Sequence, residues 1–347
     1  MRKNFESGFS LIELLIAMVG MLIVVGAVFT LMKGSIQFAM TAYETTEAQE
    51  SLRVAHEWIS RDLTGVGDGL NSIGNVRLPL NFVTTNFALN PFTDPADPAT
   101  ALLHVINPDN DVAANTVVPD SNQLVYVRAT PNATDRITLL ERDQGFNQIG
   151  LPANAINASG ANVSVSAADI GKFQVGEIYF FSSGVGAAFG VVTSINTNSR
   201  NLIFAASDIY GINQPGNNGP ISFVSGRGTL ATSLMRMQIV HYFVNSNGLL
   251  IRRVFGVKGA GYNDSVIAEH VVNLQFRYLL NLRDANGNNV QPLPQLTTTD
   301  QQPAVSAVEV RITVETARPI QNGSRQQITM TAATSVRNMQ FRNALQP

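Results

Sequence analysis

One carboxylate, Glu13, has an unusual chemical setting. It lies directly before an uncharged segment that runs from Leu14 to Met32. A charged side chain at membrane depth costs roughly 2.5–3.5 kcal/mol, so such a group normally has a partner. Residues 9 and 13 lie one turn apart on the same face of a helix. Cleavage after Gly8 would therefore place the new amino group of Phe9 beside Glu13, or beside the Glu13 of a neighbouring chain.

Two loops carry the oxygen-bearing side chains that calcium prefers. Asp284, Asn286 and Asn288 match the start of a calcium-binding loop, D-x-[DN]-x-[DN], but the later glycine and glutamate positions of that loop hold asparagine and glutamine. Asp109 and Asp111 form a shorter cluster. We expect solvated turns at both places, with bound calcium as the alternative, and no other cofactor.

No set of residues matches a known catalytic pattern. The segment that starts at His56 begins like the metalloprotease motif H-E-x-x-H, but Ser60 replaces the second histidine. His56 is therefore predicted to be a surface residue, and His241, inside an alternating segment, is predicted to be structural. There is no G-x-S-x-G segment and no phosphate-binding loop. We expect that the chain is not an enzyme; a membrane-anchored enzyme is the alternative.

The segment from Leu14 to Met32 predicts a helix that crosses a membrane. Its length as a helix is roughly 28 Å at about 1.5 Å per residue, close to the roughly 30 Å of a bilayer core. A cleaved secretory signal would need a small-x-small site after the apolar segment, and none stands there. Arg2 and Lys3 before the segment, against Lys33 after it, favour a cytoplasmic N-terminus.

The helical pattern continues beyond the apolar segment. Apolar residues recur at spacings of three and four, and opposite charges are paired on the other side. We expect one helix over residues 9–66, with a transmembrane half at 9–32 and an amphipathic half at 35–64. From Phe9 to Thr64 it would be roughly 84 Å long. The predicted apolar stripe consists of Ala48, Leu52, Ala55, Ile59 and Leu63.

The remaining residues, 67–347, predict a β head. Alternation over Val308–Glu315, and the Asn247-Gly248 pair between two apolar segments, indicate antiparallel strands and a hairpin. Residues 68–122 are interpreted as a loop-bearing connection, and residues of about 145–228 as an inserted β lobe. The expected fold class is α+β, with the long helix packed on a mainly antiparallel sheet.

The segment MRKNFESG-FSLIELLIAM resembles the processing signal of type IV prepilins and of type II secretion pseudopilins. In that family a short basic leader ends in glycine, the mature chain begins with phenylalanine, and its fifth residue is glutamate. Gly8, Phe9 and Glu13 occupy these positions. Three segments in the C-terminal half are similar to the PilW and pseudopilin-J group of large minor pilins. They are VVNLQFRYLL, VEVRITVE and ATSVRNMQFRN. Unlike major pilins, the chain is large, lacks paired cysteines and has Thr30 where many have proline.

The resemblance implies cleavage between Gly8 and Phe9 by a prepilin peptidase, removal of the leader 1–8, and N-methylation of Phe9. It implies a single-pass inner-membrane protein with a periplasmic head that later joins a cell-surface pilus. The expected partners are the peptidase, the inner membrane, and other major and minor pilins, which the N-terminal helix would contact. Glu13 would pair with the amine of Phe9 of an adjacent subunit.

Composition limits the remaining possibilities. A net charge of −2 excludes a general electrostatic nucleic-acid binder, and the absence of cysteine excludes thiolate metal sites and disulfides. We expect a PilW-like minor pilin that acts in pilus assembly or priming, at or near the tip, in a system such as that of twitching motility. The alternatives are a minor pseudopilin of a type II secretion system, and a pilus-borne module for cell adhesion or DNA uptake.

Overall fold

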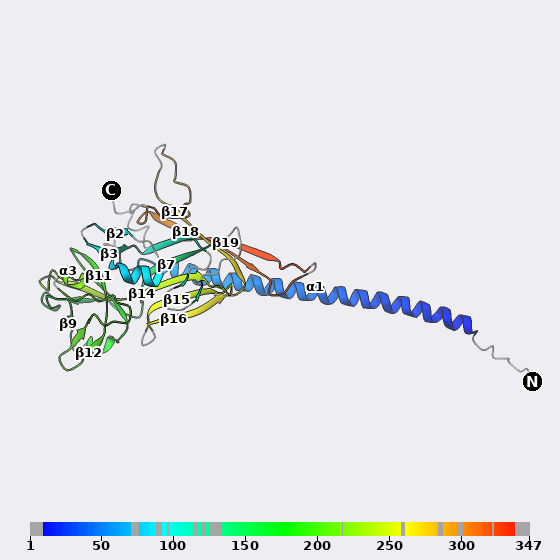
Figure 1. The fold of residues 1–347 in the computed structure, drawn as a ribbon, viewed down its shortest axis with the longest axis horizontal. Helices are drawn as coiled ribbons and strands as arrows, with labels where there is room; N and C mark the ends of the chain where they lie inside the picture. The colour runs from blue at the N-terminus through cyan, green and yellow to red at the C-terminus, as the bar shows by residue number, and fades with distance from the viewer. Residues whose placement is uncertain are drawn as a thin grey trace, which may run out of the picture. The chain divides into compact units, whose positions relative to one another are not determined.

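A computed structural model describes most of the chain (Figure 1). The described residues are 10–70, 76–87, 92–95, 97–113, 117–118, 123–124, 133–216, 218–257, 261–283, 287–297, 301–320 and 323–336. They form two compact units, each described by itself. One contains the helix as far as Glu50 together with Glu315–Ile328, and the other contains Ser51–Val314 and the residues from Thr329 on.

The first element is a long helix, α1 (Leu11–Gly65), of 55 residues. It ends at Gly65, and two residues later Gly67, with a φ of 76°, adopts a left-handed backbone that glycine accepts without strain. The predicted apolar stripe is confirmed, because all five of its residues are at most 8% exposed. The structure thus contains the long apolar helix and the mainly antiparallel β domain of the expected α+β class.

The other elements are short helices and strands. The helices are α2 (Leu80–Phe87), α3 (Pro220–Val224) and the 3-10 helix η1 (Ile170–Lys172). The strands are β1 (Val76–Pro79), β2 (Phe92–Asp94), β3 (Asp97–Leu103), β4 (Ile106–Val112), β5 (Val117–Val118), β6 (Gln123–Leu124), β7 (Thr134–Arg142), β8 (Ile149–Leu151), β9 (Asn162–Ser164), β10 (Ile178–Ser183), β11 (Gly186–Val191), β12 (Ser194–Asn196), β13 (Asn201–Ile203), β14 (Thr232–Val244), β15 (Leu250–Val257), β16 (Gly261–Ala268), β17 (Val271–Leu280), β18 (Val305–Glu315) and β19 (Gln327–Ser335).

The largest sheet is organised around the long strand β14. Its first half pairs with β10 and β8, and its second half pairs with β15 and β7. From β10 the sheet continues through β11, β1, β3 and β2, and from β15 it continues to β16. All of these pairs are antiparallel except β1 with β11, so the sheet is mixed but mainly antiparallel.

The strands with clear alternation are confirmed. β14 and β15 form the predicted hairpin, in which Gly248 adopts a φ of 72° at the turn. β17, β18 and β19 form a separate three-stranded sheet. On β18 the predicted apolar face is buried, but Thr313 and Glu315 on the predicted polar face are buried too. The alternation therefore identified the strand but not its burial on both faces.

The interpretation of residues 68–122 as a loop-bearing connection was wrong. This range supplies α2 and the strands β1 to β4 of the largest sheet, with β1 lying between β3 and β11. Its strands contain Pro79, Pro98 and Pro108, which the sequence pattern favours in turns. Burial between neighbouring strands outweighs that local preference.

The range predicted as an inserted lobe contributes strands to two sheets. β10 and β11 pair within the largest sheet, whereas β12, β13 and β9 form a small sheet of their own. This small sheet lies at the same end of its unit as α3 and β11 (Figure 1). The apolar core beneath it includes Phe181 from β10 and Leu234 from β14. Side chains of the small sheet and of the largest sheet therefore pack in one apolar core.

Candidate functional site

The N-terminal part of α1 exposes apolar side chains on every face. Among the large apolar residues between Leu11 and Met32, the exposed fraction ranges from 38% at Val25 to 84% at Leu11. The helix contains one segment long and apolar enough to cross a membrane, with a mean hydropathy of 2.8. Exposed apolar surface of this extent is not stable in water, so this segment requires a lipid or protein environment.

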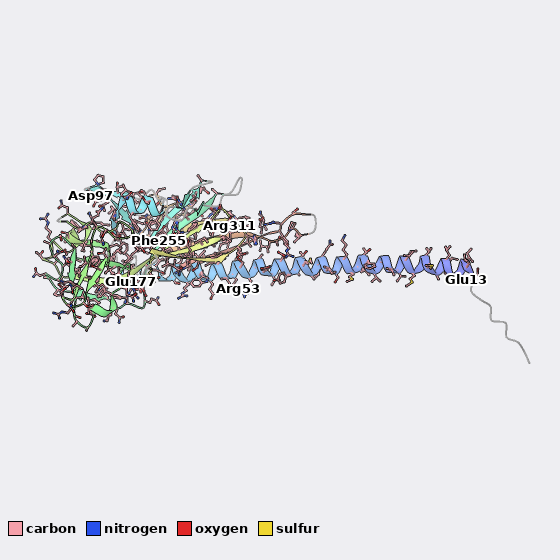
Figure 2. All side chains as sticks on the ribbon, turned by 60° about the horizontal axis from the view of Figure 1, so that its bottom comes forward. Glu13, Arg53, Asp97, Glu177, Phe255 and Arg311 are labelled. Atoms are coloured by element: carbon pink, nitrogen blue, oxygen red, sulfur yellow. The ribbon has the colours of Figure 1, made fainter. Side chains whose placement is uncertain are left out.

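Glu13 lies in the first turn of this helix and is exposed (Figure 2). Its carboxylate accepts the main-chain N–H of Ser10 at 3.0 Å. Within the described part of the chain, no ion pair includes Glu13. Gly8 and Phe9, the predicted processing residues, lie outside the described residues. Glu13 is thus a carboxylate within an apolar surface, available to a cation from another molecule.

The apolar surface of α1 extends beyond the predicted membrane segment. After Lys33, the next charged residue is Glu44, and exposed apolar side chains stand between them. A bilayer core needs about 20 apolar residues, which Leu14 to Met32 nearly supply. The later residues therefore suit contacts with protein. These exposed residues are Ile36, Phe38, Met40 and Tyr43.

Glu44 ends this apolar stretch and is held by the turn between β18 and β19. Its Oε2 accepts the main-chain N–H of Arg318 at 3.2 Å, and the Arg318 guanidinium lies 3.8 Å from its Oε1. Arg325 donates to Glu315 at 3.0 Å across the same hairpin. The hairpin thus supplies Glu44 with a hydrogen-bond donor and a nearby cation, whereas the apolar side chains before Glu44 are exposed.

The second half of α1 is attached to the sheet by a charged cluster. The Oδ2 of Asp62 accepts the Tyr242 hydroxyl at 2.5 Å and Nε of Arg252 at 2.6 Å. A second guanidinium nitrogen of Arg252 lies 3.5 Å from Glu141. Burial, and then the charge of Asp62, raise the pKa of Glu141 well above its usual value. The indole ring of Trp58 lies beside the Arg252 guanidinium, 5.3 Å from its centre.

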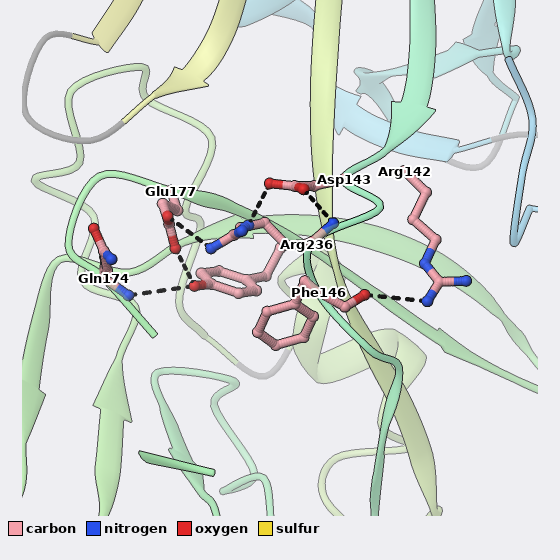
Figure 3. A network of polar contacts seen from close by, with 8 residues as sticks. Arg142, Asp143, Phe146, Gln174, Glu177 and Arg236 are labelled. Carbon is pink, nitrogen blue, oxygen red and sulfur yellow. Dashed lines mark hydrogen bonds and ion pairs between the residues drawn. The ribbon is translucent and has the colours of Figure 1, made fainter. Parts of the chain in front are cut away.

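A second polar network joins β7, β10 and β14 (Figure 3). Arg236 donates to Asp143 at 2.7 Å and to Glu177 at 3.0 Å. The hydroxyl of Tyr179 donates to Glu177 and accepts the main-chain N–H of Gln174 at 3.3 Å. Burial and the Glu177 carboxylate raise the pKa of Tyr179. Each carboxylate here is bound by a donor, so the arrangement stabilises the fold and has no base poised beside a nucleophile.

The calcium candidates lie partly outside the described residues. Asp284 and Asn286 lie outside the described residues, and Asn288 follows them in a turn region. The Asp109 carboxylate is bound by Arg136, and the main-chain N–H of Asp111 donates to Asp135 at 2.9 Å. Within the described ranges, no three His, Asp or Glu side chains gather closely enough to hold a metal ion.

The two singled-out histidines are both buried. His241 lies inside β14, as predicted, with Nδ1 2.9 Å from the Thr138 hydroxyl. The prediction of a surface position for His56 was wrong, because its side chain is only 5% exposed. Its Nε2 donates to the main-chain oxygen of Met330 on β19 at 3.2 Å. Burial lowers the pKa of His56, which the Met330 bond partly offsets.

Comparisons with known proteins identified no relative. No family model, no curated protein and no solved structure matches this chain. Its function is therefore inferred from its own residues.

Proposed function

We propose that the chain is a minor subunit of a type IV pilus, of the PilW-like kind, acting in pilus assembly or priming at or near the tip. In this proposal a prepilin peptidase cleaves between Gly8 and Phe9, and Phe9 is then N-methylated. The mature protein is held in the inner membrane by α1, with its β head in the periplasm, until it enters the filament.

The observation that carries the proposal is the continuous apolar surface of α1 with a single carboxylate near its start. Leu11 to Met32 are exposed on all faces, and Glu13 stands among them. A span that only anchored the protein would need no carboxylate, because such a group is unfavourable in lipid. A carboxylate in this position is explained if a cation from a neighbouring subunit binds it.

The amine of Phe9 suits this role by its position. Residues 9 and 13 are spaced in the sequence by about one turn of a helix. Once residues 1–8 are removed, a subunit displaced along the filament would therefore bring its own amine to the neighbour's carboxylate. Pairing two opposite charges in an apolar environment offsets the unfavourable burial of each one. The pair would fix the axial position of the incoming subunit.

The exposed apolar residues between Lys33 and Glu44 support packing against other helices. Lipid can cover the segment as far as Met32, but Phe38 and Tyr43 lie beyond it and are 77% and 68% exposed. In a filament, the helices of adjacent subunits would cover both parts. A large head fits poorly in a densely repeated shaft, which favours a position of low copy number at the tip.

The variant Glu13→Gln tests the proposal in cells that produce the filament. We expect normal amounts of the protein in the membrane fraction and at least about tenfold less of it in sheared filaments, because loss of a buried pair weakens association by more than about 1.4 kcal/mol. Glu57→Gln, an exposed change on the same helix, is the matched control. Undiminished incorporation of the Glu13 variant would contradict the pairing role. Incorporation into a secretion apparatus instead of a pilus would favour the pseudopilin alternative.

A further inference from the structure

A hollow of about 760 Å³ lies on the surface of the unit that contains Ser51–Val314. Its size is within the range of small-molecule sites. β1 and β3 form one side, and α3 and the loop after it form the other. The side chains that the argument uses are Arg77, Asp97, Thr100, Asn218, Phe223 and Arg227. Asp97, labelled in Figure 2, marks this part of the surface.

The wall formed by α3 is fixed against the sheet. Ile221 packs so closely on Gly190 of β11 that an added Cβ there would lie 2.6 Å from its Cδ1. The Ser183 hydroxyl donates to the main-chain oxygen of Val224 at 2.6 Å. With Ile221 and Val224 facing the core, Phe223 faces outward and is 44% exposed. The aromatic ring is therefore presented to the hollow by a rigid support.

Arg77 is held in place on the strand side. It is bound to Asp94, and its guanidinium lies over the Phe223 ring at 4.6 Å from the ring centre. The guanidinium has five N–H donors in a fixed plane, so one ion pair leaves others for a ligand. The Asp97 carboxylate accepts the Thr100 hydroxyl at 2.6 Å and the main-chain N–H of Ala99 at 3.2 Å. Its two oxygens retain lone pairs for further donors.

Arg227 occupies a backbone conformation that disfavours a side chain. Its φ is 56°, between Gly226 at 58° and Gly228 at 90°. The two glycines are required by close contacts, since an added Cβ would lie 2.7 Å from Leu230 and 2.4 Å from the Ile156 carbonyl oxygen, respectively. Arg227 nevertheless lines the hollow, so this turn places a guanidinium there at the cost of backbone strain.

The charges and the shape of the hollow define the ligand class. Arg77 and Arg227 are balanced by Asp94 and Asp97, so a strongly charged ligand gains little. A hydroxyl group can accept a hydrogen bond from a guanidinium and donate one to a carboxylate. Neighbouring hydroxyl groups therefore suit a hollow lined by both arginine and aspartate side chains. The exposed ring of Phe223 supplies an apolar wall for C–H groups.

A peptide strand is a poorer match for this hollow. β1 is paired on both sides, with β3 and with β11, so it offers no free edge for strand addition. The main-chain N–H groups of Gly226, Arg227 and Gly228 are already bound within their own turn. Recognition therefore depends on side chains. We propose that this hollow binds an uncharged saccharide through its hydroxyl groups.

The test uses the full chain in a detergent without a sugar headgroup. A glycan array with neutral and acidic saccharides is probed first, and saturation-transfer NMR then measures the neutral oligosaccharide that binds best. We expect binding of neutral saccharides and at least tenfold weaker binding by Arg227→Gly. That variant relieves the strained φ, so its melting temperature should not fall. Arg200→Gly, at another arginine with a positive φ of 57° but outside the hollow, is the matched control and should bind normally.

A second variant, Asn218→Ala, covers the case in which Arg227→Gly lowers stability, because Asn218 is exposed in a turn. It too should weaken binding at least fivefold. No binding of any neutral saccharide, binding of acidic saccharides alone, or equal binding by both hollow variants and the control would overturn the proposal. The outcome is separate from the pilus assignment, since neither the array nor the NMR measurement depends on filament assembly.

Discussion

The carboxylate of Asp62 on α1 accepts a hydrogen bond from the hydroxyl of Tyr242 on β14, at 2.5 Å. The same oxygen accepts Nε of Arg252 on β15 at 2.6 Å. Tyr242 and Asp62 are buried, and the Arg252 side chain is 14% exposed. Residues 51–65 of the helix are thus joined to the sheet by a charged cluster as well as by their apolar stripe. Loss of Asp62 would leave the Tyr242 hydroxyl without this acceptor and Arg252 with the more distant Glu141, at 3.5 Å.

We expect Asp62→Ala to destabilise the unit that contains Ser51–Val314 by about 3–5 kcal/mol, because Arg252 would lose its closest anionic partner in a mostly buried site. Urea unfolding of the full chain in detergent measures this change. Trp58 is the only tryptophan of the chain and lies beside Arg252, so its fluorescence reports this region.

The exposed neighbour Glu57 provides the control for that experiment. Glu57→Ala should change the free energy of unfolding by no more than about 0.5 kcal/mol, as is usual for surface substitutions. A loss below about 1 kcal/mol for Asp62→Ala would contradict the role assigned to the cluster.

Asp135 predicts a pH dependence of stability. It is buried on β7, and its carboxylate accepts main-chain N–H groups from Asp111 and Phe276. Burial raises its pKa to about 7, partly offset by these two bonds, from a usual value of 3.8. Between these two pH values the folded state binds the proton more tightly than the unfolded state. Its contribution to stability therefore falls as the pH rises, by up to about 1.4 kcal/mol per unit, and levels off above about pH 7.

The comparison of wild type with Asp135→Asn isolates this effect. The buried His56 and His241 have lowered pKa values, and they remove stability as the pH falls below about 6.5. Both proteins contain them, so they cancel in the difference between the two unfolding free energies. We expect the unfolding free energy of the wild type to fall relative to that of the variant as the pH rises from 4 to 7. A difference independent of pH would exclude a raised pKa for Asp135.

Gly190→Ala should destabilise the fold by about 1–3 kcal/mol, because the added methyl group would overlap Ile221 and Phe204 in a packed core. Gly150→Ala is the matched control, since Gly150 is also in a strand and has no atom within 4 Å of an added Cβ. Thermal unfolding of both variants measures the difference. Equal melting temperatures would show that α3 is not closely packed on β11.

Local patterns in the sequence predicted part of the fold for identifiable reasons. On β18, Val308, Val310 and Ile312 alternate with more polar residues, and on α1 the apolar stripe recurs at helical spacing. Such periodicities are visible without knowing the partners of an element. Pro98 and Pro108, in contrast, suggested turns, although tertiary pairing places them in β3 and β4.

The polar contacts could not be predicted from the sequence. Asp62 and Arg252 are 190 residues apart, and only the fold brings them together. The burial of His56 could have been predicted from the sequence, because this residue lies one helical turn after Leu52, at the edge of the apolar stripe. The Gly226-Arg227-Gly228 triplet indicates a turn, but nothing in it indicates that Arg77 lines the same hollow.

The most direct test of the pilus proposal is mass spectrometry of the N-terminal peptide of the protein isolated from membranes and from sheared filaments. We expect a peptide that begins at Phe9 and carries one methyl group on its amine. A protein that retains Met1, or that begins after the apolar segment near Met32, would contradict prepilin processing and with it the proposed mode of assembly.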